Sequence, residues 1–192
     1  MSPILVRPVR EQLEHDRIIR LLQAKYKRRF QVGANVGAER VAPAGTGPIA
    51  QYPDLVLSTL DRGHKLQAIV EVETGESVNH LEALAEWVPF ARLRGAFHLY
   101  VPSNMVEVAR RLCEENAVRV AEVWSYHSVA DEVRFTLVHR SREAAAQALR
   151  PAPKTVTPRR PSGDAKRPPR AAKPRRASAK PGRRAVKAQR RK

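Results

Sequence analysis

Three carboxylates stand where the surrounding pattern predicts burial. Asp54 opens the apolar run of residues 54–60 directly after Pro53, and Glu71 and Glu73 interrupt the apolar run AIVEVE. Side chains two positions apart on a strand point to the same face, so Glu71 and Glu73 project together. Pairing of the two runs as a hairpin brings Asp54 beside them. Burial of like charges together is unfavourable unless something neutralises them.

The chemistry that this pattern indicates is the binding of a hard divalent cation. Mg²⁺ takes oxygen ligands from one or two carboxylates, keeps several waters and binds substrate phosphates at its remaining positions. A bound Mg²⁺ or Mn²⁺ lowers the pKa of a water to generate a nucleophile, and it offsets the charge that develops on phosphate oxygens. We therefore expect a site for metal-dependent phosphodiester hydrolysis.

The spacing of these acids resembles the motif of the PD-(D/E)xK nuclease superfamily. Pro53-Asp54 is followed after 16 residues by Glu71-Val72-Glu73, and the resemblance covers roughly residues 10–125. It implies that Asp54 and Glu71 are metal ligands and that the carbonyl of Val72 assists them. Glu73 stands where the superfamily usually has a lysine that positions or activates the attacking water. Some restriction endonucleases of the superfamily have glutamate there, as a general base or a further ligand, so the implied catalytic residues are Asp54, Glu71 and Glu73.

Acidic residues on two predicted helices extend this hypothesis. Glu11 and Glu14 resemble the acidic residue that some resolvase-like members send toward the metal, and we take Glu14 as a candidate ligand. Glu86 begins a segment, EWVPF, with the spacing of the Gln-x-x-x-Tyr element of exonuclease branches, although both residue types differ. The alternative for all of these acids is a solvated helix face.

The motif residues also have a purely structural interpretation. Asp54 is compatible with a turn or strand start, since Asp is common there. Glu71 and Glu73 could lie on the exposed face of an edge strand with Val70 and Val72 inside. Against this, residues 66–72 are apolar on both faces apart from Gln67 and Glu71, as expected for a central strand.

The elements that must position these residues follow from apolar periodicity and turn signals. Residues 10–29 have an amphipathic helical pattern, with Leu13, Ile18, Leu21 and Leu22 at helical spacing. Strands are expected at 30–36, 54–60, 65–74, 97–101, 118–124 and 133–138, and a Gly- and Pro-rich loop at 37–53. Further helices are expected at 78–93, kinked or shortened by Pro89, after Ser103, and at 141–149. The apolar face expected for the helix at 78–93 consists of Val78, Leu81, Leu84, Ala85 and Val88.

This order of elements predicts an α/β fold with a mixed central sheet flanked by helices. The succession of strand, helix, strand, helix and strand implies crossover connections and hence partly parallel pairing. The same order resembles the αβββαβ core of restriction endonuclease-like proteins.

The charge distribution divides the chain into two parts. The 192 residues carry a net charge of +17, yet residues 1–149 hold 19 basic and 18 acidic side chains. Residues 150–192 hold 17 basic residues, one acidic residue and eight prolines, with no aromatic residue. We therefore predict a folded domain at 1–149 and a disordered polycationic tail at 150–192. Such a tail is expected to bind nucleic acid through its phosphates, although a merely solubilising tail has the same composition.

Several other classes of protein are disfavoured. No window of 18 apolar residues occurs, which argues against a membrane span, and the first residues lack the apolar core of a secretory signal. The single cysteine, Cys113, cannot form an internal disulfide, and the six histidines show no i, i+4 pair, so zinc is disfavoured.

The sequence therefore predicts a cytoplasmic, nucleoid-associated protein that binds DNA and hydrolyses it with Mg²⁺ or Mn²⁺. The alternatives are a catalytically inactive nuclease-fold DNA-binding protein and a structural nucleoid protein whose folded part mediates protein contacts. Restriction and resolvase members of the superfamily are often dimers, so the resemblance also allows a homodimer.

Overall fold

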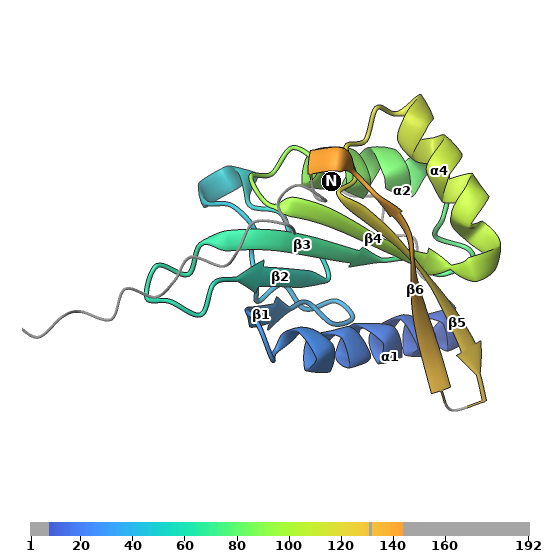
Figure 1. Cartoon of the computed structure of the whole chain (residues 1–192), viewed down its shortest axis with the longest axis horizontal. Helices are drawn as coiled ribbons and strands as arrows, with labels where there is room; N and C mark the ends of the chain where they lie inside the picture. Colours follow the sequence, from blue (N-terminus) through green and yellow to red (C-terminus); the bar gives the residue numbers. More distant parts are fainter. Residues whose placement is uncertain (1–7, 131, 144–192) are drawn as a thin grey trace, which may run out of the picture. The chain divides into compact units, whose positions relative to one another are not determined.

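A computed structural model describes residues 8–130 and 132–143, which form a six-stranded mixed sheet covered by helices on both faces (Figure 1). The order along the chain begins with α1 (Val9–Tyr26), β1 (Gln31–Ala34), the 3-10 turn η1 (Gly47–Ile49), β2 (Leu55–Ser58) and β3 (Leu66–Val72). It continues with α2 (His80–Glu82), η2 (Ala83–Trp87), α3 (Val88–Phe90), β4 (Ala96–Pro102), η3 (Ser103–Met105), α4 (Val106–Glu115), β5 (Glu122–Val129) and β6 (Glu132–Arg140). The predicted α/β class and mixed sheet are confirmed.

The strands lie in the sheet in chain order. β1, β2 and β3 pair antiparallel, β4 lies parallel to β3, β5 lies parallel to β4, and β6 returns antiparallel along β5. The helices of the β3–β4 and β4–β5 connections make the two parallel crossovers possible, as the sequence pattern predicted. β3 therefore has a partner strand on both sides, which makes it a central strand.

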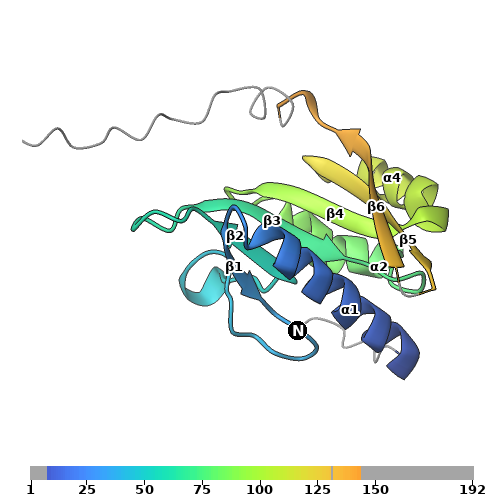
Figure 2. The same ribbon diagram turned by 60° about the horizontal axis from the view of Figure 1, so that its bottom comes forward.

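Two apolar clusters hold the helices against opposite faces of the sheet. α1 packs through Ile18, Ile19 and Leu22 on one face, where Leu55, Leu57 and Val70 meet it. The other cluster includes Val56, Ile69 and Leu99 of the sheet together with Trp87 and Ala109 of the opposite helices. Figure 2 shows α1 crossing its face of the sheet from the far end of β5 and β6 toward β1.

The helical segment after β3 differs from the prediction. Residues 80–90 stay helical through Pro89, because η2 is a π-helical turn in which the Val88 N–H bonds to the Ala83 carbonyl five residues earlier. In this segment Ala83, Trp87 and Phe90 are buried, while Leu81 and Leu84 are exposed. The expected apolar face through Leu81 and Leu84 was therefore wrong.

Smaller differences concern the boundaries of elements and the burial of single residues. In α1, Leu13 and Leu21 are exposed, and His15 takes a buried position in their place. β5 begins at Glu122 rather than at residue 118. Most of the predicted helix at 141–149 and the whole predicted tail at 150–192 lie outside the described residues. None of the described helices is long and apolar enough to cross a membrane.

Candidate metal centre

The candidate site lies where β2 begins and β3 ends. In the antiparallel pairing of these strands Leu55 is opposite Val70 and Val56 is opposite Ile69. The same register, continued by one residue, places Asp54 opposite Glu71. The predicted proximity of these two residues is borne out by a hydrogen bond of 3.1 Å from the Asp54 backbone N–H to Glu71 Oε2.

Both glutamates of the motif are buried. The side chains of Glu71 and Glu73 are 4% and 0% exposed, so the edge-strand interpretation, with both acids facing solvent, was wrong. The physical reason is the pairing of β3 with β2 and β4, together with the helices that cover this face.

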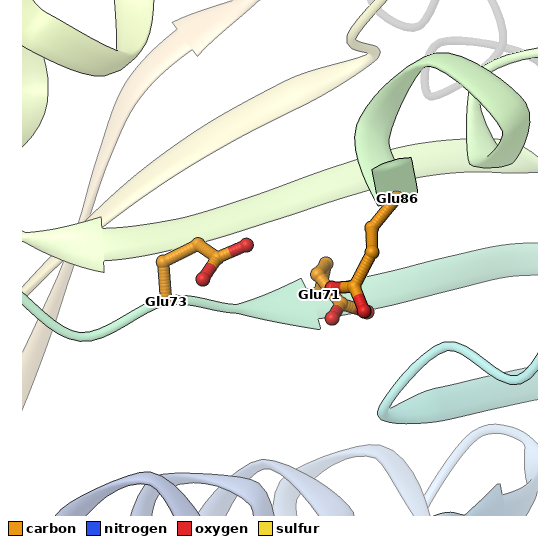
Figure 3. A group of neighbouring side chains, drawn as sticks. All are labelled: Glu71, Glu73 and Glu86. Carbon is orange, nitrogen blue, oxygen red and sulfur yellow. The ribbon is translucent and has the colours of Figure 1, made fainter. Parts of the chain in front are cut away.

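A third glutamate joins them from the helical segment that follows. Glu86 of η2 points down to Glu71, and Glu73 follows just beyond the end of β3 (Figure 3). One carboxylate oxygen from each of Glu71, Glu73 and Glu86 lies within 4.8 Å of the others. The π-helical turn positions both Glu86 and its neighbour Trp87, and such turns are frequent at functional sites. Sequence reasoning placed Glu86 near the motif without recognising it as a ligand.

Asp54 is held beside the three glutamates by two contacts of its carboxylate. Its Oδ2 atom accepts a hydrogen bond of 2.8 Å from the Val72 N–H and lies 3.2 Å from His15 Nε2. The carboxylate is thus held between the end of β3 and helix α1, and it lies outside the group formed by the three glutamates. Val72 contacts the site through its N–H, whereas the resemblance implied a role for its carbonyl.

His15 is a site residue that sequence reasoning missed. The six histidines show no pair at metal-ligand spacing, and His15 belongs instead to the buried face of α1 with Ile18, Ile19 and Leu22. A histidine at i, with apolar residues at i+3, i+4 and i+7, was the available signal. Its other ring nitrogen, Nδ1, lies 3.5 Å from Asp16 Oδ1, so the ring stands between two carboxylates.

Glu73 is fixed by the core. Trp87 Nε1 donates to Glu73 Oε1 over 2.6 Å. The backbone of Glu73 is held as well, because its N–H donates to the Tyr100 carbonyl and its carbonyl accepts from the Tyr126 hydroxyl, both at 2.8 Å. Because both its side chain and its backbone are held by hydrogen bonds, this carboxyl group has a defined orientation.

The electrostatics of the group disfavour charge on Glu71. Burial raises the pKa of the Glu71 carboxyl well above its usual value, and the nearby carboxylates of Asp54, Glu86 and Glu73 raise it further. The hydrogen bond from the Asp54 N–H acts in the opposite direction. A cation bound among these acids would offset this shift, because its positive charge favours the ionised carboxylates.

The two glutamates of α1, Glu11 and Glu14, contact different parts of the structure. Glu11 Oε2 accepts a hydrogen bond of 2.5 Å from Thr74 Oγ1, directly after Glu73. Glu14 is exposed, and its Oε1 accepts from Ser128 Oγ of β5 over 3.3 Å. The predicted ligand Glu14 is therefore not brought to the three glutamates, and Glu11 is the acid of this helix that approaches the end of β3.

The donor set fits a hard divalent cation. It consists of carboxylate oxygens alone, which suit Mg²⁺ or Mn²⁺ better than zinc. Within residues 8–130 and 132–143 no other group of three or more His, Cys, Asp or Glu side chains has this proximity. Cys113 is remote from such chemistry, because burial raises the pKa of its thiol to about 12.

Comparison of the chain with protein-family models, with curated proteins and with solved structures found no match.

Proposed function

We propose that this protein is a Mg²⁺- or Mn²⁺-dependent DNA nuclease of the PD-(D/E)xK type, with a basic tail that adds affinity for nucleic acid. The observation that carries the proposal is the convergence of Glu71, Glu73 and Glu86 at the end of a central strand, with two of the three buried. Buried carboxylates without a cation are costly, so their retention together favours a bound metal.

Two further observations support the same proposal. The chain order of α1, β1, β2, β3, a helical segment and β4 is the order of elements in that superfamily's core. Asp54 also lies directly after Pro53 and opposite Glu71, as the motif requires.

The glutamates and Asp54 would have different roles in this site. Glu71 and Glu86 would hold the cation with Glu73, whose orientation is fixed by Trp87. Asp54, anchored by His15 and the Val72 N–H, would add negative charge at the edge of the group. A cation bound there would lower the pKa of a water and offset charge on the phosphate oxygens. Because Glu73 is 0% exposed, we assign it a ligand role rather than that of a base that reaches the substrate.

A second candidate function is DNA binding without cleavage. It is favoured by one observation: the position that usually holds a lysine is Glu73, and its side chain is buried against Trp87. In that case the domain would keep the fold of a nuclease while the tail supplies affinity, and the expected nucleoid association would follow from binding alone.

The experiment that separates these functions is cleavage of labelled linear, circular and branched DNA at low salt, with Mg²⁺, Mn²⁺ or EDTA. The wild-type chain is compared with Glu71→Gln and with Glu76→Gln, which changes an exposed glutamate. Metal-dependent nicking that is lost only in Glu71→Gln supports the nuclease. Binding of every substrate without cleavage contradicts it and supports the second function.

A further inference from the structure

A long loop between β1 and β2 is tied to the candidate metal centre by one buried side chain. Asn35 is 5% exposed and follows β1 directly. Its Oδ1 accepts hydrogen bonds from the N–H groups of Val41 and Ala42 at 3.0 and 2.8 Å. Its Nδ2 donates to the carbonyls of Ala42 and Pro53 at 2.9 and 2.6 Å.

The same residue also holds the backbone of the motif aspartate. The Asn35 N–H donates to the Asp54 carbonyl over 2.9 Å, so one residue connects the loop at 41–42 with Pro53 and Asp54. Gly33 allows this close approach, because a Cβ atom there would lie 2.6 Å from Ala42 Cβ. The loop therefore has a fixed position relative to Asp54.

This arrangement places a cation and an aromatic ring on the segment that leads into Asp54. The guanidinium carbon of Arg40 lies 5.7 Å from the ring centroid of Tyr52, two residues before Asp54. Both side chains are exposed, and Tyr52 is 38% exposed. In the part of the chain that the structure describes, no carboxylate forms an ion pair with Arg40.

A polyanionic substrate needs such a cation. The carboxylates of Asp54, Glu71, Glu73 and Glu86 repel phosphates, and a single divalent ion does not cancel four negative charges. A guanidinium is planar and presents its N–H donors as a fork, which suits bidentate binding of a phosphate. An exposed tyrosine ring can also stack with an unpaired base.

We propose that Arg40 and Tyr52 form a nucleotide-binding element beside the metal centre. Arg40 binds a backbone phosphate near the one that is cleaved, and Tyr52 orients Arg40 and stacks with an adjacent base. The ligand class is a nucleic acid strand with at least one unpaired nucleotide at the site. This inference rests on the proposed function, because it assumes that the metal centre acts on nucleic acid. Binding of an oligonucleotide by Arg40 and Tyr52 can nevertheless be measured without any cleavage.

The test is the affinity of the full chain for a single-stranded oligonucleotide in EDTA, at about 0.3 M salt so that the salt-dependent contribution of the tail is weakened. Arg40→Gln is compared with the control variant Arg94→Gln. Arg94 is an exposed arginine next to Gly95, and Gly95 lies against Leu66, at the opposite end of β3 from the acids. We expect affinity to fall about tenfold in Arg40→Gln and to change little in Arg94→Gln. Arg40→Lys should recover only part of the loss, and Tyr52→Phe should bind like wild type.

Photocrosslinking gives an independent readout. With an oligonucleotide that carries 5-iodouracil, the expected crosslink is in the tryptic peptide of residues 41–62, which contains Tyr52, and it should disappear in Tyr52→Ala. Equal losses in Arg40→Gln and Arg94→Gln, or crosslinks confined to the tail, would overturn the proposal.

The same experiments separate this inference from the proposed function. If wild type binds through Arg40 and Tyr52 but cleaves nothing, the nuclease proposal fails and the binding element stands. If cleavage occurs and Arg40→Gln binds and cleaves like wild type, the binding element fails alone.

Discussion

His15 of α1 and Asp54 at the start of β2 meet across 39 residues of sequence, with His15 Nε2 3.2 Å from Asp54 Oδ2. His15 is 3% exposed and Asp54 is 7% exposed, so the contact is shielded from water. Because the Val72 N–H bonds to the same oxygen, helix α1 and strand β3 together fix the carboxylate of the motif aspartate. This contact joins the helix to the centre that the strands build.

Loss of this contact should destabilise the chain and disturb the site. His15→Ala removes a buried ring and its contact with Asp54, and we expect unfolding to be easier by about 2–4 kcal/mol. His15→Gln, which places an N–H donor near the position of Nε2, should recover part of that loss and most of the Mn²⁺ affinity. Denaturant unfolding and calorimetric Mn²⁺ titration measure the two effects. His127→Ala, which changes an exposed histidine of β5, is the control. Equal effects of His15→Ala and His127→Ala would contradict the prediction.

Glu71 should make the metal-free chain less stable as pH rises. Its pKa is raised in the folded state above the usual 4.5, so the folded chain binds this proton more tightly than the unfolded chain does. The stability is therefore complete below about pH 4.5 and is lost as pH rises through the raised pKa. In EDTA, the Tm of Glu71→Gln should exceed that of wild type by a margin that widens from pH 4 to pH 8. A constant margin would show that the carboxyl titrates normally.

Addition of metal should reverse that trend. A cation needs deprotonated carboxylates, so its affinity and the rise in Tm that it causes should both increase with pH. We expect Mn²⁺ to raise the Tm of wild type more at pH 8 than at pH 5. Glu71→Gln and Glu86→Gln should show a smaller rise at both pH values, whereas Glu76→Gln should behave like wild type. An identical rise in every variant would place the bound metal elsewhere.

The indole N–H of Trp87 should contribute to the free energy of unfolding. Trp87→Phe keeps most of the buried ring but removes the hydrogen bond of 2.6 Å to Glu73 Oε1, so we expect a loss of about 1.5–3 kcal/mol. Trp124→Phe is the matched control, because Trp124 Nε1 also donates a hydrogen bond to a glutamate, Glu122, over 2.8 Å. When that bond is lost, Glu122 still accepts a hydrogen bond of 2.8 Å from Arg140. The loss at Trp124 should therefore be smaller. Denaturant midpoints of both variants, with and without Mn²⁺, test this, and equal losses would count against it.

Removal of residues 150–192 should weaken DNA binding and reduce its dependence on salt. Seventeen basic residues lie in that segment, and each phosphate contact that is lost lowers the slope of log K against log salt by about 0.9 for duplex DNA. Affinity measured over a range of salt for the full chain and for residues 1–149 gives both quantities. The same slope for the two chains would show that the basic segment does not bind phosphates.

The sequence by itself determined the class of fold, the hairpin and the motif acids. Alternating and helical periodicities are local properties, so they located α1, the β2–β3 pair and β4 within a few residues. Hairpin pairing predicted correctly that Asp54 lies beside Glu71, whereas the register that sets the two residues opposite each other came from the structure. The apolar character of residues 66–72 also predicted correctly that β3 is a central strand.

Only the tertiary structure decided which acids come together. The π-helical turn at Ala83–Trp87 carries Glu86 to Glu71, and no local pattern encodes this change of helical phase. Leu81 and Leu84 of the same segment are exposed. The packing of α1 across the sheet brings His15 to Asp54 and Glu11 to Thr74, while Glu14 meets Ser128. These contacts join residues 39 to 114 positions apart. They depend on how helices dock on the sheet, whereas the pattern along the chain specifies only which faces are apolar.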